Sequence, residues 1–377
     1  MRIAVVSDVL GEENNGTTIA AMNFIRSLRA KGHEVRIICP DADKTGEFGY
    51  YIVKTLNVGP LNGYVEKNGV SIARPDKRVI KKALKGIDAV HIMVPFLVGC
   101  YVAKYCHKHD IPLSAGFHCQ AENFSNHIFL MNSHRFNNAV YKFFYKHMYQ
   151  YCDAIHYPTQ FICNTFENVV GLTPHHVISN GVNHQFHRNI PKHKINDGLF
   201  RILFIGRYSK EKTHIVLLKA INKSKYRNRI QLIFAGDGPQ KKNLQVYATK
   251  HLPIQPVMKF YSREELLDVI GSADLYVHAA EIELEAISCL EAISCGLVPV
   301  INNSPRSATK YFALDEKNLF KCNNAKDLAA KIDYWLEHPE EKERRSLEYA
   351  DFAKQWEFDK CMDQMEEMLL SICKKKK

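Results

Sequence analysis

The sequence predicts an α/β protein made of two doubly wound, Rossmann-like domains that face each other across a cleft. Apolar, β-branched runs alternate with helical patterns from end to end, which is typical of parallel sheets covered by helices. The alternation starts again near residue 200, after a polar segment rich in turn formers between Asn180 and Gly198. A chain of 377 residues is also too long for one ordinary core.

Six runs in the first half have the length and composition of buried strands: 3–7, 35–39, 89–94, 113–117, 154–157 and 176–179. A helix from about Thr17 to Lys31 separates the first two, and Gly32 follows it as a left-handed cap. The second half repeats the pattern with strands at 202–205, 232–235, 258–261, 275–278, 298–301 and 319–321. We therefore expect domains at 1–183 and 184–350, followed by a C-terminal helix and basic tail at 351–377.

The composition narrows the class of protein. Hydrophobic residues make up 46% of the chain and charged residues 24%, as in a folded soluble protein. Eleven cysteines lie scattered without a CxxC pair, which favours reduced thiols in the cytoplasm and implies no metal site. The opening "MRIAVVSDV" has the pattern of a first strand rather than of a signal peptide, and no eighteen apolar residues run together.

The positive charge is spread over the chain but has one notable gap in acidic residues. The net charge is +11, and no acidic residue occurs between Glu122 and Asp153. That window interleaves aromatic with basic residues: Phe124, Phe129, Phe136, Tyr141, Phe143, Phe144, Tyr145 and Tyr149, with Arg135, Lys142 and Lys146. Such a helix is suited to an anionic membrane surface. The alternative is a buried core helix whose lysines extend outward to solvent.

The stretch "EIELEAISCLEAISCGLVPV" sets Glu283 and Glu291 eight residues apart across a junction from loop to helix. Ionised carboxylates only accept hydrogen bonds, so the pair could take the hydroxyl protons of a ribose and a hexose. Helix amides near Ala286 and Ile287 would direct partial positive charge at an anionic ligand. The alternative is an amphipathic helix that carries two solvated glutamates.

Three glycine-containing segments follow predicted strands. In "GRYSKEK", Gly206 allows a tight turn, and Arg207 and Lys212 supply two cations suited to a diphosphate. The segment "GDGPQKKNL" forms a turn before a helix. In "NNGTT", Gly16 precedes a helix capped by Thr17 or Thr18 and would let the backbone approach a phosphate or sugar. Taken singly, each segment is equally compatible with an ordinary structural turn.

In this order the segments resemble the GT-B fold retaining glycosyltransferases of family four. The resemblance also includes "FHCQAEN" with His118 and "NGV" at 180–182, and it covers nearly the whole chain. It implies that Arg207 and Lys212 hold the diphosphate. It further implies that Glu291 holds the ribose, Glu283 the transferred hexose, and His118 a sugar hydroxyl near the reaction centre.

Within that family the likeness is greatest to bacterial glycolipid synthases that act on diacylglycerol or ceramide. It rests on "AAEIELEAISCLEAISCG", on "NNSPRSATKYFAL" and on the aromatic, basic stretch after "FHCQAEN". Many relatives have Phe-Gly after the first glutamate, where this chain has Leu284, Glu285 and Ala286. They also have a Gly-Gly loop where this chain has 302–304. By this comparison, Glu285 would help to select the sugar.

The resemblance implies transfer of a hexose with retention of configuration from a nucleotide sugar, UDP-glucose or UDP-galactose. No residue stands out as a covalent nucleophile or dedicated base, so we expect front-face substitution. Arg207 and Lys212 would stabilise the departing diphosphate, whose oxygen would take the acceptor proton. Because the two cations serve this purpose, neither a cofactor nor a divalent metal is expected.

The expected partners are the nucleotide sugar, a lipid acceptor and the anionic inner face of the cell membrane, where the enzyme would be peripheral. One alternative keeps the chemistry and changes the acceptor to a soluble or polymer-linked glycan. Another is a nucleotide-sugar epimerase on the same two-domain fold. Nucleic acid is not an expected partner, because the sequence lacks the usual nucleic-acid-binding motifs.

Overall fold

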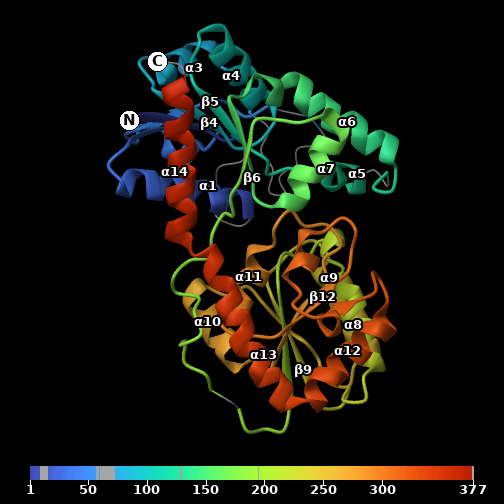
Figure 1. Ribbon diagram of the computed structural model, residues 1–377. Coiled ribbons are helices and arrows are strands. Elements are labelled where there is room, and N and C mark those ends of the chain that lie inside the picture. Colours follow the sequence, from blue (N-terminus) through green and yellow to red (C-terminus); the bar gives the residue numbers. More distant parts are fainter. Residues whose placement is uncertain (9–15, 57–58, 60–72, 128–129, 194, 376–377) are drawn as a thin grey trace. The chain divides into compact units, whose positions relative to one another are not determined.

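In the computed structural model (Figure 1), the described residues are 1–8, 16–56, 59, 73–127, 130–193 and 195–375. The chain divides into two compact units, one of residues 1–180 with 359–377 and one of residues 181–358. Each unit contains one parallel β-sheet with helices in the connections between strands. The predicted α/β class with two doubly wound domains is therefore confirmed.

The first unit has a seven-stranded sheet in the order β3-β2-β1-β4-β5-β6-β7. Its strands are β1 (Arg2–Val6), β2 (Glu34–Cys39), β3 (Tyr50–Ile52), β4 (Ala89–Ile92), β5 (Leu113–Gly116), β6 (Ala154–Tyr157) and β7 (His175–Val177). Its main helices are α1 (Gly16–Ala30), α3 (Lys77–Leu84), α4 (Leu97–Lys108), α5 (Ala121–His127), α6 (His134–His147), α7 (Gln160–Val170) and α14 (Phe358–Lys375).

Two details of the first unit differ from the sequence predictions. The three-residue strand β3, which is half-buried at the edge of the sheet, was not predicted. Helix α1 already includes Gly16, so Thr17 and Thr18 are helical residues rather than caps, and the residue before Gly16 lies outside the described chain. Gly32 has φ 83°, as predicted for a left-handed position after this helix.

The second unit has a six-stranded sheet in the order β10-β9-β8-β11-β12-β13. Its strands are β8 (Phe200–Ile205), β9 (Ile230–Ala235), β10 (Val257–Lys259), β11 (Leu275–His278), β12 (Pro299–Asn302) and β13 (Leu319–Phe320). Its helices are α8 (His214–Lys223), α9 (Lys241–His251), α10 (Arg263–Ser272), α11 (Ile287–Ser294), α12 (Ala325–Glu337) and α13 (Pro339–Phe352).

The central strands of both sheets are buried on both faces, which explains why they are continuous apolar runs. In β8, Ile202, Leu203 and Phe204 are all fully buried although their side chains alternate between faces. In β1, residues 3–6 are fully buried in the same way. This pattern requires helices on both faces of each sheet, as Figure 1 shows for the second unit.

The C-terminal helix α14 packs on the first unit although it follows the second in the chain. Glu366 accepts hydrogen bonds from Lys31 Nζ and His33 Nε2, each over 2.7 Å. The chain thus crosses between the units twice. The two crossing segments are bonded to each other, because Val182 N donates to Trp356 O over 2.7 Å and Phe358 N donates to Val182 O over 3.0 Å.

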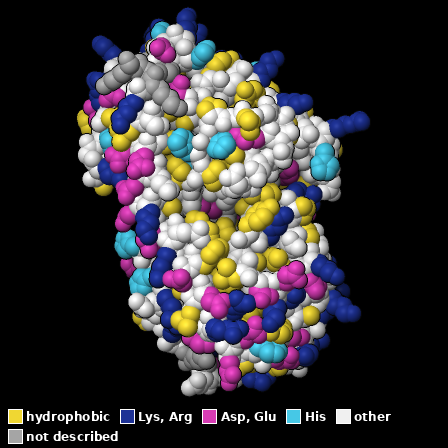
Figure 2. All heavy atoms as spheres, viewed as in Figure 1, with side chains coloured by type: hydrophobic (Ala, Val, Ile, Leu, Met, Phe, Trp, Pro, Cys, Tyr) yellow, Lys and Arg dark blue, Asp and Glu magenta, His cyan; other side chains and the backbone are white. Residues whose placement is uncertain are grey.

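Helix α6 combines both alternatives considered for the aromatic, basic stretch. Tyr141 and Phe144 are buried, whereas Lys142, Lys146 and Phe143 face solvent, with Phe143 54% exposed. Lysine and arginine side chains project from the outline of the first unit near this helix (Figure 2). No helix in the described part of the chain has the length and apolar character needed to cross a membrane.

Candidate functional site

The motifs of the second unit meet where its strand order reverses. From β8 the chain continues to β9 on one side, and β11 pairs with β8 on the other. Ligands of doubly wound sheets bind at the carboxyl ends of the strands at such a switch point. The loop after β8 carries Arg207 and Lys212, and the loop after β11 carries Glu283. The topology therefore brings the basic and the acidic motif to the same edge of the sheet.

The loop after β8 packs closely against the glycines of the loop after β9. A Cβ atom on Gly236 would lie 2.2 Å from Gly206 O, and one on Gly238 would lie 2.7 Å from Tyr208 N. Tyr208 N donates to Asp237 O over 2.9 Å. The "GDGP" segment is thus a structural turn whose glycines let it lie directly against the segment that carries Arg207.

Glu283 and Lys212 form an ion pair at the switch point, as Lys212 Nζ donates to Glu283 Oε1. His278 Nε2 lies 3.0 Å from the same oxygen. Burial would raise the pKa of Glu283, but the Lys212 charge and the His278 bond outweigh it and lower the pKa to about 2. Since its side chain is only 11% exposed, Glu283 is not the solvated glutamate of the alternative interpretation.

Glu291 has the opposite electrostatic character. It lies on α11, is partly buried, and forms no side-chain hydrogen bond within the described residues. Burial raises its pKa to about 7, against a small lowering effect of Arg263. A carboxyl group without a partner in a partly buried position is able to accept hydrogen bonds from a ligand hydroxyl.

Two helices at the switch point are each preceded by a residue in the left-handed backbone conformation. Ala286 precedes α11 with φ 62°, and Thr213 precedes α8 with φ 47°. Thr213 Oγ1 donates to Ala279 O, which ties the two loops together. Ile287 is the first helical residue, so the amides predicted near Ala286 and Ile287 do lie at a helix N-terminus. Such positions cost about 1 kcal/mol for residues other than glycine.

The loop after β11 is held by side chains from the end of β12 and the segment that follows it. Asn302 Nδ2 donates to Ala279 O over 2.9 Å, and Ser304 Oγ donates to Glu281 O over 2.6 Å. Arg306 forms an ion pair with Glu281, which is buried. The polar residues here therefore have a supporting role that the sequence alone did not reveal.

Among the remaining predicted residues, Glu285 lies on the loop after β11, and Gly16 and His118 belong to the first unit. Glu285 is only 3% exposed. Gly16 is exposed at the start of α1 in the first unit. His118 also belongs to the first unit, where it is buried over Gly116, and burial lowers its pKa to about 3. His118 is therefore neutral, and its Nε2 has no hydrogen-bond partner among the described residues.

The residues that sequence reasoning missed are Tyr276 and His278. They are two residues apart on β11, so their side chains lie on the same face of the strand. Tyr276 OH is 3.0 Å from His278 Nδ1. The available signal was a polar pair at spacing two inside an apolar strand. Such a pair is unusual in a strand that is buried on both faces.

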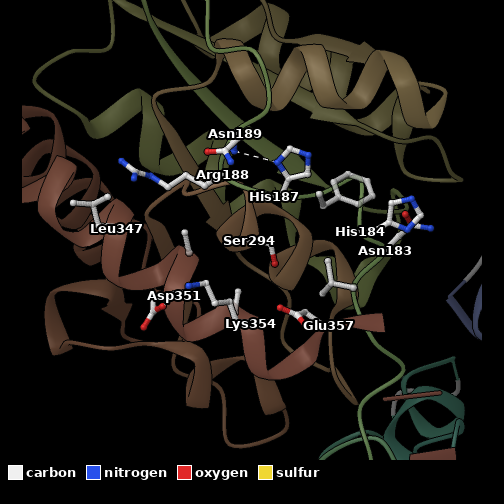
Figure 3. Close-up of a pocket in the computed structure, with 14 residues that line it drawn as sticks. Asn183, His184, His187, Arg188, Asn189, Ser294, Leu347, Asp351, Lys354 and Glu357 are labelled. Carbon is white, nitrogen blue, oxygen red and sulfur yellow. Dashed lines mark hydrogen bonds and ion pairs between the residues drawn. The ribbon is translucent and has the colours of Figure 1, made fainter. Parts of the chain in front are cut away.

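A separate pocket of about 580 Å³ lies in the second unit at the other end of α11 (Figure 3). It is lined by residues from 182–189, by Ser294 at the end of α11, and by residues from 347–357 in α13 and the turn after it. His187, Arg188 and Asn189 lie on one side, facing Asp351 and Lys354 across the pocket in Figure 3. None of Arg207, Lys212, Glu283 and Glu291 lines this pocket.

Three potential metal ligands, Cys163, Glu167 and His175, lie together on the neighbouring elements α7 and β7. Glu167 Oε1 already accepts bonds from Thr173 N over 2.9 Å and from His175 Nδ1 over 2.7 Å. These bonds join α7 to β7. They account for the cluster as a structural contact that needs no ion.

Comparison with known proteins supports the same assignment of the two units. The model described as Glycosyltransferase Family 4 matches residues 14–186, and the model described as Glycosyl transferases group 1 matches residues 185–351. A GDP-mannose-dependent alpha-mannosyltransferase of Corynebacterium glutamicum is 26% identical over 80% of this chain and 72% of its own length. An alpha-monoglucosyldiacylglycerol synthase of Acholeplasma laidlawii is 23% identical over 90% of this chain and 89% of its own.

Two solved structures are also similar. The catalytic domain of a cholesterol-alpha-glucosyltransferase from Helicobacter pylori is 52% identical, covering 42% of this chain and 98% of that domain, with a TM-score of 0.41. A sucrose-phosphate synthase from Thermosynechococcus elongatus is 15% identical, covers 98% of each chain and has a TM-score of 0.77, which shows the fold. The chain therefore belongs to the GT-B glycosyltransferases with family 4 and group 1 domains, and it is an enzyme that transfers sugar.

Proposed function

We propose that this enzyme transfers glucose or galactose from a UDP-linked donor to a membrane lipid such as diacylglycerol or ceramide, with retention of configuration and without a metal ion. The observation that carries the proposal is the pairing of Lys212 with Glu283 beside the Arg207 loop, at the switch point of the second sheet. There a diphosphate would meet cations while the sugar hydroxyls meet a fixed carboxylate.

The proposed chemistry follows from the charges at this edge of the sheet. Arg207 and Lys212 would stabilise the negative charge that grows on the diphosphate as the glycosidic bond breaks. The departing oxygen would take the proton of the acceptor hydroxyl on the same face of the sugar. Glu283, ionised because its pKa is about 2, would hold a hexose hydroxyl, and Glu291 would hold the ribose.

The lipid acceptor is supported by the exposed face of α6, where Lys142 and Lys146 flank the 54% exposed Phe143. A partly exposed aromatic ring between lysines suits the boundary between headgroups and acyl chains of an anionic membrane. The glycolipid synthase of Acholeplasma laidlawii is a relative over nine-tenths of the chain. We place the enzyme on the inner face of the cell membrane as a peripheral protein.

A second donor is favoured by one comparison. The relative from Corynebacterium glutamicum is named as a GDP-mannose-dependent enzyme, so GDP-mannose is the alternative donor. The cations at the switch point would bind the diphosphate of either nucleotide. The difference would lie in contacts to the base and to the hexose.

A panel of donors against lipid acceptors tests the proposal. UDP-glucose, UDP-galactose and GDP-mannose are each offered with diacylglycerol, ceramide, cholesterol or a soluble glycan, with EDTA present, and the product linkage is determined by NMR. We expect an α-linked hexosyl lipid from a UDP-sugar. A product on the soluble glycan alone would overturn the lipid acceptor, and conversion of the donor without any acceptor would indicate an epimerase.

Membrane binding is tested separately by flotation with anionic vesicles. The double variant Lys142→Glu/Lys146→Glu should bind at least tenfold more weakly than the wild type. The matched control Lys219→Glu/Lys223→Glu makes the same change in charge on exposed positions of α8 and should bind as the wild type does. Equal loss in both variants would show that only net charge matters.

The role of Arg207 is tested by kinetics. Arg207→Ala should lower kcat by about a hundredfold, which corresponds to the loss of a few kcal/mol of transition-state stabilisation, with a smaller change in KM for the donor. The control Arg227→Ala removes an exposed arginine near the start of β9, at the opposite end of the sheet, and should leave both constants unchanged. An equal effect of Arg207→Ala on binding and turnover would instead indicate uniform binding.

A further inference from the structure

His278 is completely buried at the end of β11, and both of its ring nitrogens have partners. Nε2 lies 3.0 Å from Glu283 Oε1, and Nδ1 lies 3.0 Å from the hydroxyl of Tyr276. The ring is also stacked on Phe204, with centroids 5.9 Å apart and planes 6° from parallel. The position of the imidazole ring and the direction of each of its nitrogens are therefore fixed.

The positions of the protons in the hydrogen-bonded series Tyr276–His278–Glu283 follow from which of these groups can donate. Burial lowers the pKa of His278 in spite of Glu283, so the ring is neutral and carries a single N–H. The ionised Glu283 can only accept, so the proton must lie on Nε2. Nδ1 is then an acceptor, and the hydroxyl of Tyr276 must donate to it. Burial keeps that hydroxyl protonated by raising the pKa of Tyr276.

The fixed tautomer makes the two oxygens of Glu283 unequal. Oε1 is held by Lys212 and His278 from two directions. Oε2 has no hydrogen-bond partner in the part of the chain that the structure describes. The carboxylate therefore has one anchored oxygen and one that remains available as an acceptor.

We propose that His278, held in its Nε2–H form by Tyr276, is a positioning residue that anchors Oε1 of Glu283 and so directs Oε2 toward a hydroxyl of the transferred hexose. This inference rests on the proposed function of Glu283 as the sugar-binding carboxylate. Neither Tyr276 nor His278 touches the substrate in this arrangement. Their effect would be on how sharply the site distinguishes sugars by the hydroxyl that Oε2 accepts.

The tautomer is measured directly by ¹⁵N NMR on the full-length protein labelled in its histidine rings. The His278 signals are identified by their loss in His278→Gln. We expect a protonated Nε2 and an unprotonated Nδ1 that stay unchanged from about pH 8 to about pH 5.5. An Nδ1–H form or an imidazolium within this range would overturn the proposal.

The catalytic consequence is measured with three variants and one control. His278→Leu fills the same space without a donor and should lower kcat/KM by ten- to a hundredfold. His278→Gln can still donate to Glu283 and accept from Tyr276, so it should stay within about threefold of the wild type. Tyr276→Phe should lower kcat/KM by three- to tenfold. Tyr349→Phe removes another buried tyrosine hydroxyl of the second unit, which binds Leu314 N, and should have no effect.

A merely structural role is separated from positioning by monodeoxy donors. In the wild type, removing the hydroxyl that Oε2 accepts should reduce kcat/KM at least tenfold, and in His278→Leu this preference should fall to about twofold. An unchanged preference in His278→Leu, or equal loss in His278→Gln, would overturn the proposal. If no nucleotide sugar is a substrate, the proposed function fails, whereas the NMR result still decides the tautomer.

Discussion

At the scale of single residues, Glu283 and Glu291 differ in their environment far more than their shared chemistry implies. Glu283 lies between Lys212 and His278, which lower its pKa to about 2. Glu291 is partly buried without a hydrogen-bond partner in the described chain, and burial raises its pKa to about 7. Glu283 is therefore always charged, whereas ionisation of Glu291 lowers the stability of the folded protein.

Glu291→Gln tests this difference. The folded-state pKa of Glu291 lies above its unfolded value of about 4.5, so its stabilising contribution is full below that pH and is lost as the pH rises through about 7. We expect Glu291→Gln to unfold at the same urea concentration as the wild type at pH 4.5. At pH 8 it should be more stable, by on the order of 1 kcal/mol.

The matched control is Glu367→Gln, which changes an exposed glutamate on α14 and should show no such pH dependence. A difference between Glu291→Gln and the wild type that is equal at both pH values would show that Glu291 titrates normally. Under the proposed function, the same variant should also raise KM for the donor about tenfold. That loss corresponds to about 1.4 kcal/mol of binding free energy, the value of one hydrogen bond to a charged group.

At the scale of elements, the position of Arg207 depends on the close contact between the loops after β8 and β9. A Cβ atom on Gly236 would lie 2.2 Å from a backbone oxygen that cannot move without shifting the whole loop. We expect Gly236→Ala to lower the free energy of unfolding by about 1–3 kcal/mol. It should also reduce turnover at least tenfold, because the loop that carries Arg207 is displaced.

Asp237→Ala is the control for Gly236→Ala. Its side chain is exposed and bonds to Gly238 N and Lys241, so the backbone contact between the two loops is kept. Urea unfolding and steady-state turnover are measured for both variants. Should Gly236→Ala match Asp237→Ala in both measurements, the close approach of the loops would have no role in the site.

The elements also show how far the sequence determines this fold. All twelve predicted strands are found, and the central ones are continuous apolar runs because they are buried on both faces. The edge strand β3 was missed, although the equally short edge strands β7 and β10 were predicted. The ion pairs that dock α14 on the first unit join Lys31 to Glu366, and no local pattern predicts a contact between such distant residues.

The site was predictable to a similar degree. The sequence identified Lys212 and Glu283, and the parallel sheet brings them together because adjacent strands end at one edge. It did not reveal His278 or the support from Asn302 and Ser304, since those roles depend on side-chain directions in three dimensions. The left-handed conformation of Ala286 was equally hidden, because alanine gives no signal for it.

At the scale of the whole molecule, buried histidines determine how the protein responds to acid. Five are buried across the two units, namely His91, His118, His156, His214 and His278. Burial lowers the pKa of each, to about 3 for His118 and His214 and to about 4 for His156. Two carboxyl groups act in the opposite sense, because burial raises the pKa of both Asp8 and Glu291 to about 7.

The sign of the pH dependence follows from these shifts. A histidine whose folded pKa lies below its unfolded value of about 6.5 stabilises the protein fully above that pH, and the contribution is lost as the pH falls toward the folded pKa. Asp8 and Glu291 instead gain stability as the pH falls from about 7. Since five histidines act against two carboxyl groups, these groups together take up protons on unfolding, so stability should fall as the pH decreases below about 6.5.

Urea unfolding at a series of pH values measures this slope, and His214 offers the sharpest variant. Its ring is enclosed by Phe204, Tyr208 and Phe234, and within the part of the chain that the structure describes neither nitrogen has a hydrogen-bond partner. His214→Leu keeps most of the volume and removes one titrating group, so the slope should decrease by about one proton. His184→Gln changes an exposed histidine and should leave the slope as it is. An unchanged slope in His214→Leu would mean that acid unfolds the protein through other groups, because the buried, unpartnered ring would then not resist protonation.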